Sequence, residues 1–204
     1  MTREPAAHWW IDAASGAAPR AVRGLFASWI ELNPEARATA QSLDVLGGLL
    51  VGEGDPDGLP PLPDISDPAR QDRFSVADPL YPSPLTELGF RSAIRPWRSR
   101  MGGIRARKIE TWCEPGVDAR LFHFDADAGI PAHDHIGDEF TLVLAGGFSD
   151  QEGVYHRGDL SCAHSGILHE PRGLPDESCI CLTVSIGGYR FRNPLMALIS
   201  SFLK

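Results

Sequence analysis

Two histidine-containing blocks, residues 133–139 and a second block that ends at His169, limit most strongly how this chain can fold. The first block reads His-Asp-His-Ile-Gly-Asp-Glu. Side chains alternate between the two faces of an extended strand, so His133, His135 and Glu139 can face one side, and the intervening glycine allows a bend. The fold must then bring His169 to the same place, which requires strands that are distant in sequence to lie together.

The four side chains His133, His135, Glu139 and His169 form a set that suits a metal ion. Neutral imidazole nitrogens and a carboxylate oxygen, at about 2.0–2.2 Å from the ion, are usual ligands of zinc. The same nitrogen and oxygen set with open positions also suits iron, manganese or nickel. In the alternative interpretation, all four are polar core residues that hydrogen bonds satisfy. We predict a metal site, with zinc as the expected ion.

The second half of the chain alternates apolar and polar residues in short runs, which is typical of strands. The predicted strands are residues 104–111, 119–124, 140–145, 147–148, 154–155 and 178–186. Short strands separated by turn signals predict a mainly β fold, an antiparallel β-barrel or jelly roll, whose mouth could hold the metal. Residues 194–203 could end the chain as a short helix or as an edge strand.

The first fifty residues show helical periodicity instead. After Pro19 an apolar stripe recurs at helical spacing and consists of Val22, Leu25, Phe26, Trp29 and Ile30. Asn33 followed by Pro34 predicts an N-cap and the first residue of a second helix, which should fray near residues 47–48. Two amphipathic helices cannot form a stable core alone, so they must pack on each other, on the rest of the chain or on another protein. If they bind a partner, we expect the stripe to be partly exposed when the protein is alone, or buried in a self-dimer.

Composition divides the chain of 204 residues into three parts. We predict a helical region at 1–54, a proline-rich linker at 55–88 and a β domain at 89–204, because prolines and acidic residues are concentrated between the two patterns. No long apolar run or basic-then-apolar leader occurs, so neither a membrane span nor a signal peptide is predicted. We expect a cytoplasmic protein, and the sequence leaves a homodimer open.

The formal net charge of -8 argues against direct binding of nucleic acid, which requires a basic surface. Residues 91–108 are locally basic, and could form an anion or partner patch, or a solvated face that balances acids elsewhere. The four cysteines are too few and too unevenly spaced for a secreted disulfide framework, so we expect them to be reduced. Cys179 and Cys181 share one face of a predicted strand and should pack as small apolar residues.

Glycines around the ligand set complete a known pattern. Gly129 and Gly146 flank the first block, and Gly158 and Gly166 precede His169. Together with the four ligands, they resemble the two-part motif of the cupin superfamily, G-x-H-x-H-x-E-x-G and G-x-P-x-G-x-H with variable gaps. His164 stands where that family usually has proline. The resemblance implies a cupin-type antiparallel barrel at 89–204, with the four residues as metal ligands.

A narrower resemblance covers most of the chain. Residues 131–150, 153–159 and 169–171, with the paired cysteines, resemble the cupin domain of ChrR-type anti-sigma factors, and residues 29–37 and 43–50 resemble the helical domain of that family. The resemblance implies that the helical domain sequesters an extracytoplasmic-function sigma factor. It also implies that the metal-bearing cupin relays an oxidative signal such as singlet oxygen.

One feature of that family is missing here. Its N-terminal zinc motif, H-x-x-x-C-x-x-C, aligns with Trp29, Asn33 and Ala36, and the first 112 residues contain one histidine, His8, and no cysteine. We therefore predict no zinc site in the helical region, and apolar packing must offset the stability that zinc would supply. Residues 1–60 contain more acidic than basic side chains, so an acidic helical module could cover a basic surface of a sigma factor.

These observations leave functions of different classes. The first is a ChrR-like transcriptional regulator, an anti-sigma factor with a metal-binding sensory cupin. The second is a metal-dependent cupin oxygenase or isomerase, in which His164, His123 or Glu170 could transfer a proton. The third is a cupin that binds a small molecule without catalysis. Fold alone does not choose among them, because cupins host many chemistries.

Overall fold

The computed structural model describes residues 5–51, 82, 85, 97–99 and 102–191, with the backbone alone for residues 45–51, 99 and 191. The helical elements are α1 (Ala7–Ser15), α2 (Arg20–Leu32), α3 (Pro34–Val51) and the 3-10 helix η2 (Glu110–Trp112). The strands are β1 (Arg98–Ser99), β2 (Ile104–Lys108), β3 (Val117–Phe124), β4 (His133–His135), β5 (Glu139–Ala145), β6 (Gly147–Ser149), β7 (Val154–His156), β8 (Leu160–Ala163), β9 (Arg172–Gly173), β10 (Cys179–Ile186) and β11 (Tyr189–Phe191).

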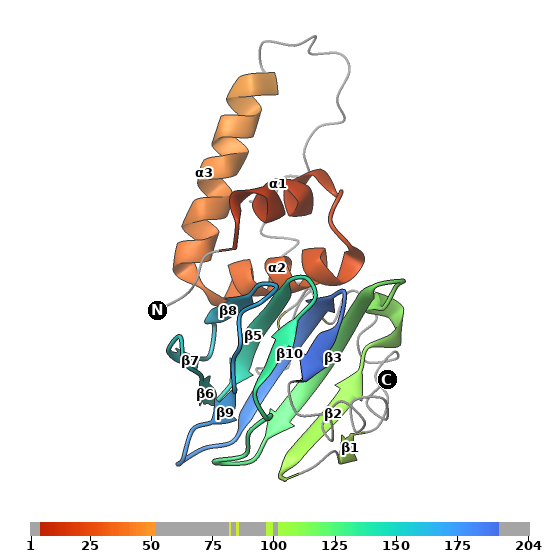
Figure 1. Cartoon of the computed structure of the whole chain (residues 1–204). Helices are drawn as coiled ribbons and strands as arrows, with labels where there is room; N and C mark the ends of the chain where they lie inside the picture. The colour runs from red at the N-terminus through yellow and green to blue at the C-terminus, as the bar shows by residue number, and fades with distance from the viewer. Residues whose placement is uncertain (1–4, 52–81, 83–84, 86–96, 100–101, 192–204) are drawn as a thin grey trace.

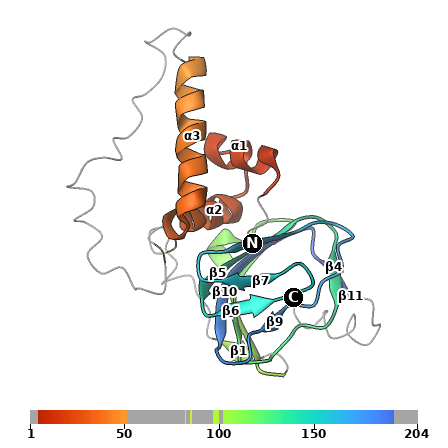
Figure 2. The ribbon, with the colours of Figure 1, turned by 90° about the vertical axis from the view of Figure 1, so that its left-hand side faces the viewer.

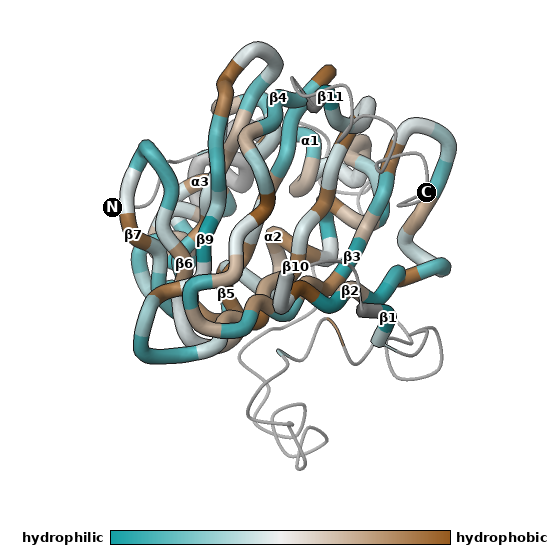
Figure 3. The backbone as a smooth tube through the Cα atoms, turned by 60° about the horizontal axis from the view of Figure 1, so that its bottom comes forward, coloured by the Kyte–Doolittle hydropathy of each residue, from teal (hydrophilic) through white to brown (hydrophobic). Residues whose placement is uncertain are grey.

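The strands form three antiparallel sheets. The largest has the order β1-β2-β3-β10-β5-β8, and two smaller sheets, β11-β4 and β7-β6-β9, stand beside it. Figure 1 shows the large sheet below the helices, and Figure 2 shows the smaller sheets closing the other side of the barrel. Hydrophobic and hydrophilic residues alternate along these strands (Figure 3), as period-two patterning requires. The prediction of a mainly β, cupin-type barrel after a helical region is confirmed.

Both faces of the large sheet are buried. On its outer face Leu142, Leu182 and Val184 are completely buried in a core that also contains residues of α1 and α2. On its inner face Cys179 and Cys181 belong to a second core, with Phe124, Phe148 and Tyr155. All four cysteines are free, and these two are buried as the sequence predicts. A sheet that is buried on both faces needs two covers, and the helices provide one of them.

Helix α2 covers the outer face of the large sheet (Figures 1 and 2). Val22 and Leu25 are fully buried, and Phe26 packs edge-on against Phe140 of β5 at 5.6 Å between ring centroids. Of the alternatives that the sequence leaves open, packing on the rest of the chain is the one observed, and the expectation of a stripe exposed for a partner, or buried in a self-dimer, is wrong. The surface that covers this apolar helix face is the chain's own barrel.

The turn between α2 and α3 is tied to the barrel through one side chain. Asn33 Oδ1 accepts hydrogen bonds from the backbone N–H groups of Glu35 and Ala36, both at 3.0 Å, which is the predicted N-cap of α3. Its Nδ2 donates to the Gly158 carbonyl at 3.0 Å. Gly158 has φ +88°, and a Cβ there would lie 3.1 Å from the Leu32 carbonyl oxygen, so glycine permits this close approach.

The other predicted helices and strands agree with the structure only in part. Helix α3 continues past Gly47–Gly48 to Val51, so the predicted fraying is wrong. The strand predicted at 104–111 ends at Lys108 and is followed by η2, while the short strands β1, β8, β9 and β11 were not predicted. The predicted element at 194–203 and both domain boundaries lie outside the described residues, so they stay predictions. Among the helices that the structure describes, none is long and apolar enough to cross a membrane.

The described part of the basic stretch contains paired side chains. Lys108 lies 3.5 Å from Asp118, and Arg105 forms an ion pair with Asp125. The guanidinium of Arg107 stacks 4.2 Å from the ring centroid of Trp97. These contacts favour the interpretation of a face that balances acids within the fold.

We predict that Asn33→Ala lowers the free energy of unfolding by about 1–2 kcal/mol, because it removes both the α3 cap and the bond to Gly158. Asn33→Asp should lose less, since its carboxylate still caps the helix but cannot donate to the Gly158 carbonyl. Urea unfolding of the full chain measures both variants. Equal stabilities of the alanine variant and the wild type would contradict this role of Asn33.

Candidate metal centre

Backbone pairing brings the two histidine blocks together. His133 and His169 exchange a reciprocal pair of backbone hydrogen bonds, at 3.1 and 3.0 Å, although they are far apart in sequence. His135 forms a bridge with Ser165 on the same segment. Glu139 begins β5, where it lies opposite Ser185 of β10. Backbone pairing therefore holds the segments that carry all four ligands.

The glycine in the first block is required by close packing. A Cβ at Gly137 would lie 2.6 Å from the Ile186 carbonyl oxygen, which is too close for any other residue without a backbone shift. On either side of it, the Ile136 N–H donates to the Gly188 carbonyl and the Ile186 N–H donates to the Asp138 carbonyl. The chain thus passes tightly against the end of β10, and Glu139 enters the site on the same face as the histidines.

The four predicted residues converge into one buried group. His133, His135, Glu139 and His169 are 2%, 1%, 6% and 5% exposed, and one ligand atom from each lies within 4.8 Å of all the others. His169 Nε2 lies 2.9 Å from His135 Nε2 and 3.1 Å from His133 Nε2. Glu139 Oε1 lies 3.8 Å from His135 Nε2 and 4.0 Å from His169 Nε2. Neighbouring ligands of a tetrahedral ion with bonds of about 2.0–2.1 Å are about 3.3 Å apart, which falls within these distances.

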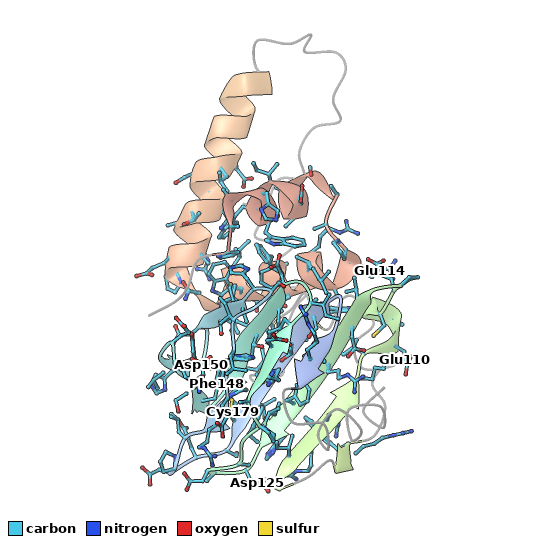
Figure 4. The ribbon with its side chains drawn as sticks, viewed as in Figure 1. Glu110, Glu114, Asp125, Phe148, Asp150 and Cys179 are labelled. Carbon is cyan, nitrogen blue, oxygen red and sulfur yellow. The ribbon has the colours of Figure 1, made fainter. Side chains whose placement is uncertain are left out.

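Two of the imidazoles are oriented by acceptors on their outer nitrogens. His133 Nδ1 lies 3.1 Å from the Pro131 carbonyl oxygen, and His169 Nδ1 lies 3.3 Å from Asp150 Oδ2. A carbonyl and a carboxylate only accept, so both Nδ1 atoms carry a proton and both Nε2 atoms face the centre. Figure 4 shows Asp150 beside Phe148 at the β6 side of the barrel. His135 Nδ1 has no hydrogen-bond partner within the described structure.

The carboxylate of Glu139 is held through its other oxygen. Ser185 Oγ donates to Glu139 Oε2 at 2.6 Å and lies 2.6 Å from the Tyr189 hydroxyl. The Tyr189 ring also packs edge-on against His133 and His135, at 5.8 and 5.5 Å between centroids. These contacts leave Oε1 as the oxygen that faces the histidines, so Glu139 is arranged as a ligand through one oxygen.

Burial sets the charge states in this group. Burial lowers the pKa of both His133 and His135 from 6.5 to about 4, so both imidazoles are neutral at pH 7. Burial and the Glu139 charge raise the pKa of Tyr189 well above its usual value, which keeps the phenol protonated. Burial raises the pKa of Asp150, but hydrogen bonds from His169 and from the backbone outweigh it and lower the pKa overall.

The donor set fits a metal cation. His133 Nε2 and His169 Nε2 lie 3.1 Å apart in a buried space, and burial opposes protonation of the His133 imidazole. A cation between the two nitrogens could bind both of them and pair with the Glu139 carboxylate. The buried group could therefore bind a metal ion, whose identity the geometry does not specify.

The residues suggested for proton transfer are placed elsewhere. His164 Nδ1 lies 2.8 Å from Asp138 Oδ1, with its side chain 40% exposed. His123 lies beside Arg105 and Asp125, and Asp125 is at the barrel end away from the helices (Figure 4). Glu170 is exposed next to Arg172. None of the three belongs to the buried group of four.

Sequence reasoning missed the side chains that orient the ligands. No sequence motif identifies Ser185, Tyr189 or Asp150 as a residue that orients a ligand. A weak signal existed for Ser185, because it follows Thr183 as a polar residue on the inward face of an otherwise apolar strand. Asp138 lies within the first block, but the ligand pattern of that block assigns it no role.

Comparisons with known proteins agree with this geometry and extend over the helices. Residues 86–186 match the family described as the ChrR cupin-like domain. The chain is 33% identical over 199 residues to the anti-sigma-E factor ChrR of Cereibacter sphaeroides, which covers 94% of this chain and 92% of that protein. The chain belongs to the ChrR family of anti-sigma factors. The resemblance stated from the sequence is confirmed.

A solved structure agrees with this membership of the ChrR family. The crystal structure of Rhodobacter sphaeroides SigE in complex with the anti-sigma ChrR matches with a TM-score of 0.70 and 28% identity, over 90% of this chain and 98% of the matched chain. The likeness therefore includes the helical region as well as the cupin.

Within the ChrR family, this chain fills the positions of the N-terminal zinc motif with residues that pack or cap. Trp29 is 2% exposed and packs against Trp10 and Phe26, at 5.1 and 5.9 Å between ring centroids. Asn33 caps α3, and Ala36 in the first turn of that helix is buried. Aromatic packing and a helix cap occupy the place of metal ligands, and the absence of a zinc site there stays a prediction.

We predict that the metal-free protein loses stability as the pH falls from 7 to 5. His133 and His135 titrate near 6.5 when unfolded and near 4 when folded, so between these values the unfolded state binds more protons. The free energy of unfolding therefore decreases as the pH falls through this window, by about 2 kcal/mol for one such histidine.

Urea unfolding in the presence of a chelator, at pH 7 and at pH 5, measures this pH dependence. His133→Asn, which removes one of the two titrating groups, is the control and should show a smaller difference between the two pH values. An unfolding free energy that does not change between pH 7 and pH 5 would contradict the burial of neutral imidazoles.

Proposed function

We propose that this chain is an anti-sigma factor that sequesters an extracytoplasmic-function sigma factor through its helical region. The likeness to the anti-sigma factor ChrR carries this proposal, because it spans both the helices and the cupin. The helical region is also acidic, as covering a basic, DNA-facing surface requires. In this proposal the cupin is the regulatory part.

We further propose that His133, His135, Glu139 and His169 are the ligands of one zinc ion. Four protein ligands, all buried, match a closed structural or sensory zinc site, whereas a catalytic site keeps an open position. When bound, zinc would supply a cross-link between β4, β5 and the segment that ends at His169. The closed site supports a regulator over the alternative of a cupin oxygenase or isomerase, which would use iron, manganese or nickel with open positions.

Because the α2 stripe is buried, its residues are unsuitable for a mutation that tests partner binding. Phe26 supports the barrel, so a charge at this position would disrupt the fold and would not report on a partner. Ile11 of α1 is 62% exposed and is the most exposed large apolar side chain that the structure describes. It therefore serves as the probe for a partner that docks on the helices.

We predict that purified protein carries about one zinc ion per chain, because one ligand cluster is available. His133→Ala and His169→Ala should each abolish stoichiometric metal, since losing one of four ligands opens the site. Glu139→Gln should weaken binding less than either histidine change. Elemental analysis of protein purified without added metal measures this, with exposed His156→Ala as the control. Full occupancy in either alanine variant would reject the ligand assignment.

We predict that the full chain co-elutes in gel filtration with an extracytoplasmic-function sigma factor encoded beside it. Ile11→Arg should weaken this complex roughly tenfold, because a charge would enter an apolar contact. Val154→Arg, an exposed apolar position on β7 of the cupin, is the matched control and should bind like the wild type. A housekeeping sigma factor tests specificity. Separate elution of the two wild-type proteins would refute sequestration.

A further inference from the structure

A single carboxylate connects the metal-binding segments to helix α1. Asp138 lies between two of the proposed ligands, His135 and Glu139, in the link from β4 to β5. Its Oδ2 accepts a hydrogen bond from Trp9 Nε1 of α1 at 2.9 Å, and its Oδ1 accepts one from His164 Nδ1 at 2.8 Å. Both oxygens are therefore engaged, one by the helical region and one by the loop that leads to the last ligand.

We propose that Asp138 couples occupancy of the metal site to the position of α1. Backbone pairing holds the two ligand-bearing segments side by side, and a bound metal would also cross-link their side chains and fix the Asp138 carboxylate between Trp9 and His164. Without metal this cross-link is absent, the carboxylate moves more freely, and α1 loses its hydrogen bond to the barrel. This inference rests on the metal site proposed above, and it identifies α1 as the helix that responds to the site.

The geometry on the metal side supports this coupling. Asp138 precedes Glu139 directly, and its carbonyl oxygen is fixed by the Ile186 N–H at 2.8 Å. His164 begins the turn closed by the Ile167 N–H on its carbonyl, and this turn leads into His169. The two partners of the contact thus sit on the two segments that a metal would cross-link. A bound cation would draw ligand atoms of both segments to one point, and its removal would take away that constraint.

Helix α1 depends strongly on its tertiary contacts. It has nine residues, and no side chain caps its N-terminus at Ala6. A helix this short is marginal in water, so packing must hold it. Trp10 packs on Phe26 at 5.5 Å, and Trp9 packs edge-on against Phe140 at 5.3 Å. Of its two tryptophans, Trp9 makes the hydrogen bond to the barrel, so losing that bond should loosen the whole helix.

Hydrogen–deuterium exchange of the full chain, loaded with zinc or stripped with a chelator, tests the coupling. In the wild type we expect the α1 amides to exchange roughly tenfold faster in the stripped protein, as the loss of one ordered hydrogen bond allows. Trp9→Phe keeps the ring packed on Phe140 but removes the N–H donor. It should bind zinc normally, and its α1 should exchange fast in both states.

A matched control separates this contact from general effects near the ligands. Asp134→Asn changes a carboxylate that lies between His133 and His135 and pairs with Arg190. It should keep the wild-type difference between the loaded and stripped states. Asp138→Asn is the second test of the contact, because an amide cannot accept from both Trp9 and His164 in the same way, and it should reduce the difference even if Trp9→Phe folds poorly.

Elemental analysis of each sample distinguishes the possible failures. A wild type that gains and loses zinc while its α1 exchange stays constant would overturn the coupling and leave the metal site intact. Trp9→Phe that keeps the full metal dependence would also overturn it. A wild type that binds no metal would refute the proposed site, and the coupling with it.

Discussion

Both faces of the large sheet are buried, and the rest of the structure follows from this constraint. The inner face is closed by the barrel itself, around Cys179, Cys181 and the candidate metal centre. The outer face carries Leu142 and Leu182, which are buried in one core with residues of α1, α2 and η2. The helical region and the cupin therefore share one continuous hydrophobic core, so a change in one can reach the other through packed side chains.

This shared core can stabilise a helical region that lacks metal ligands of its own, as we predict for this chain. Trp29 lies in the aromatic cluster, and Asn33 both caps α3 and bonds to the barrel at Gly158. Structural zinc can supply on the order of 10 kcal/mol to a small domain, and burial against the sheet can offset the loss of such a site. The cupin thus supports the helices structurally as well as carrying the proposed sensory site.

The candidate metal centre is buried, and residues outside the ligand set support it. Asp150 orients His169, and Ser185 together with Tyr189 holds Glu139, so hydrogen bonds direct these ligand side chains toward the centre. In the proposed anti-sigma function, a signal would act by disturbing this site, and the disturbance would be felt by the helices packed on the barrel.

The sequence alone determined the four candidate ligands, most strands and the cap at Asn33, because motifs, period-two alternation and capping depend on residues close together in the chain. It showed an apolar face on α2 but left open whether another helix, the rest of the chain or a partner covers that face. Only the tertiary structure showed that the face covers the barrel, and that Ser185, Asp150 and Asp138 surround the ligands. Periodicity shows which face of an element is apolar, whereas the surface that covers it is set by strand pairing between distant parts of the chain.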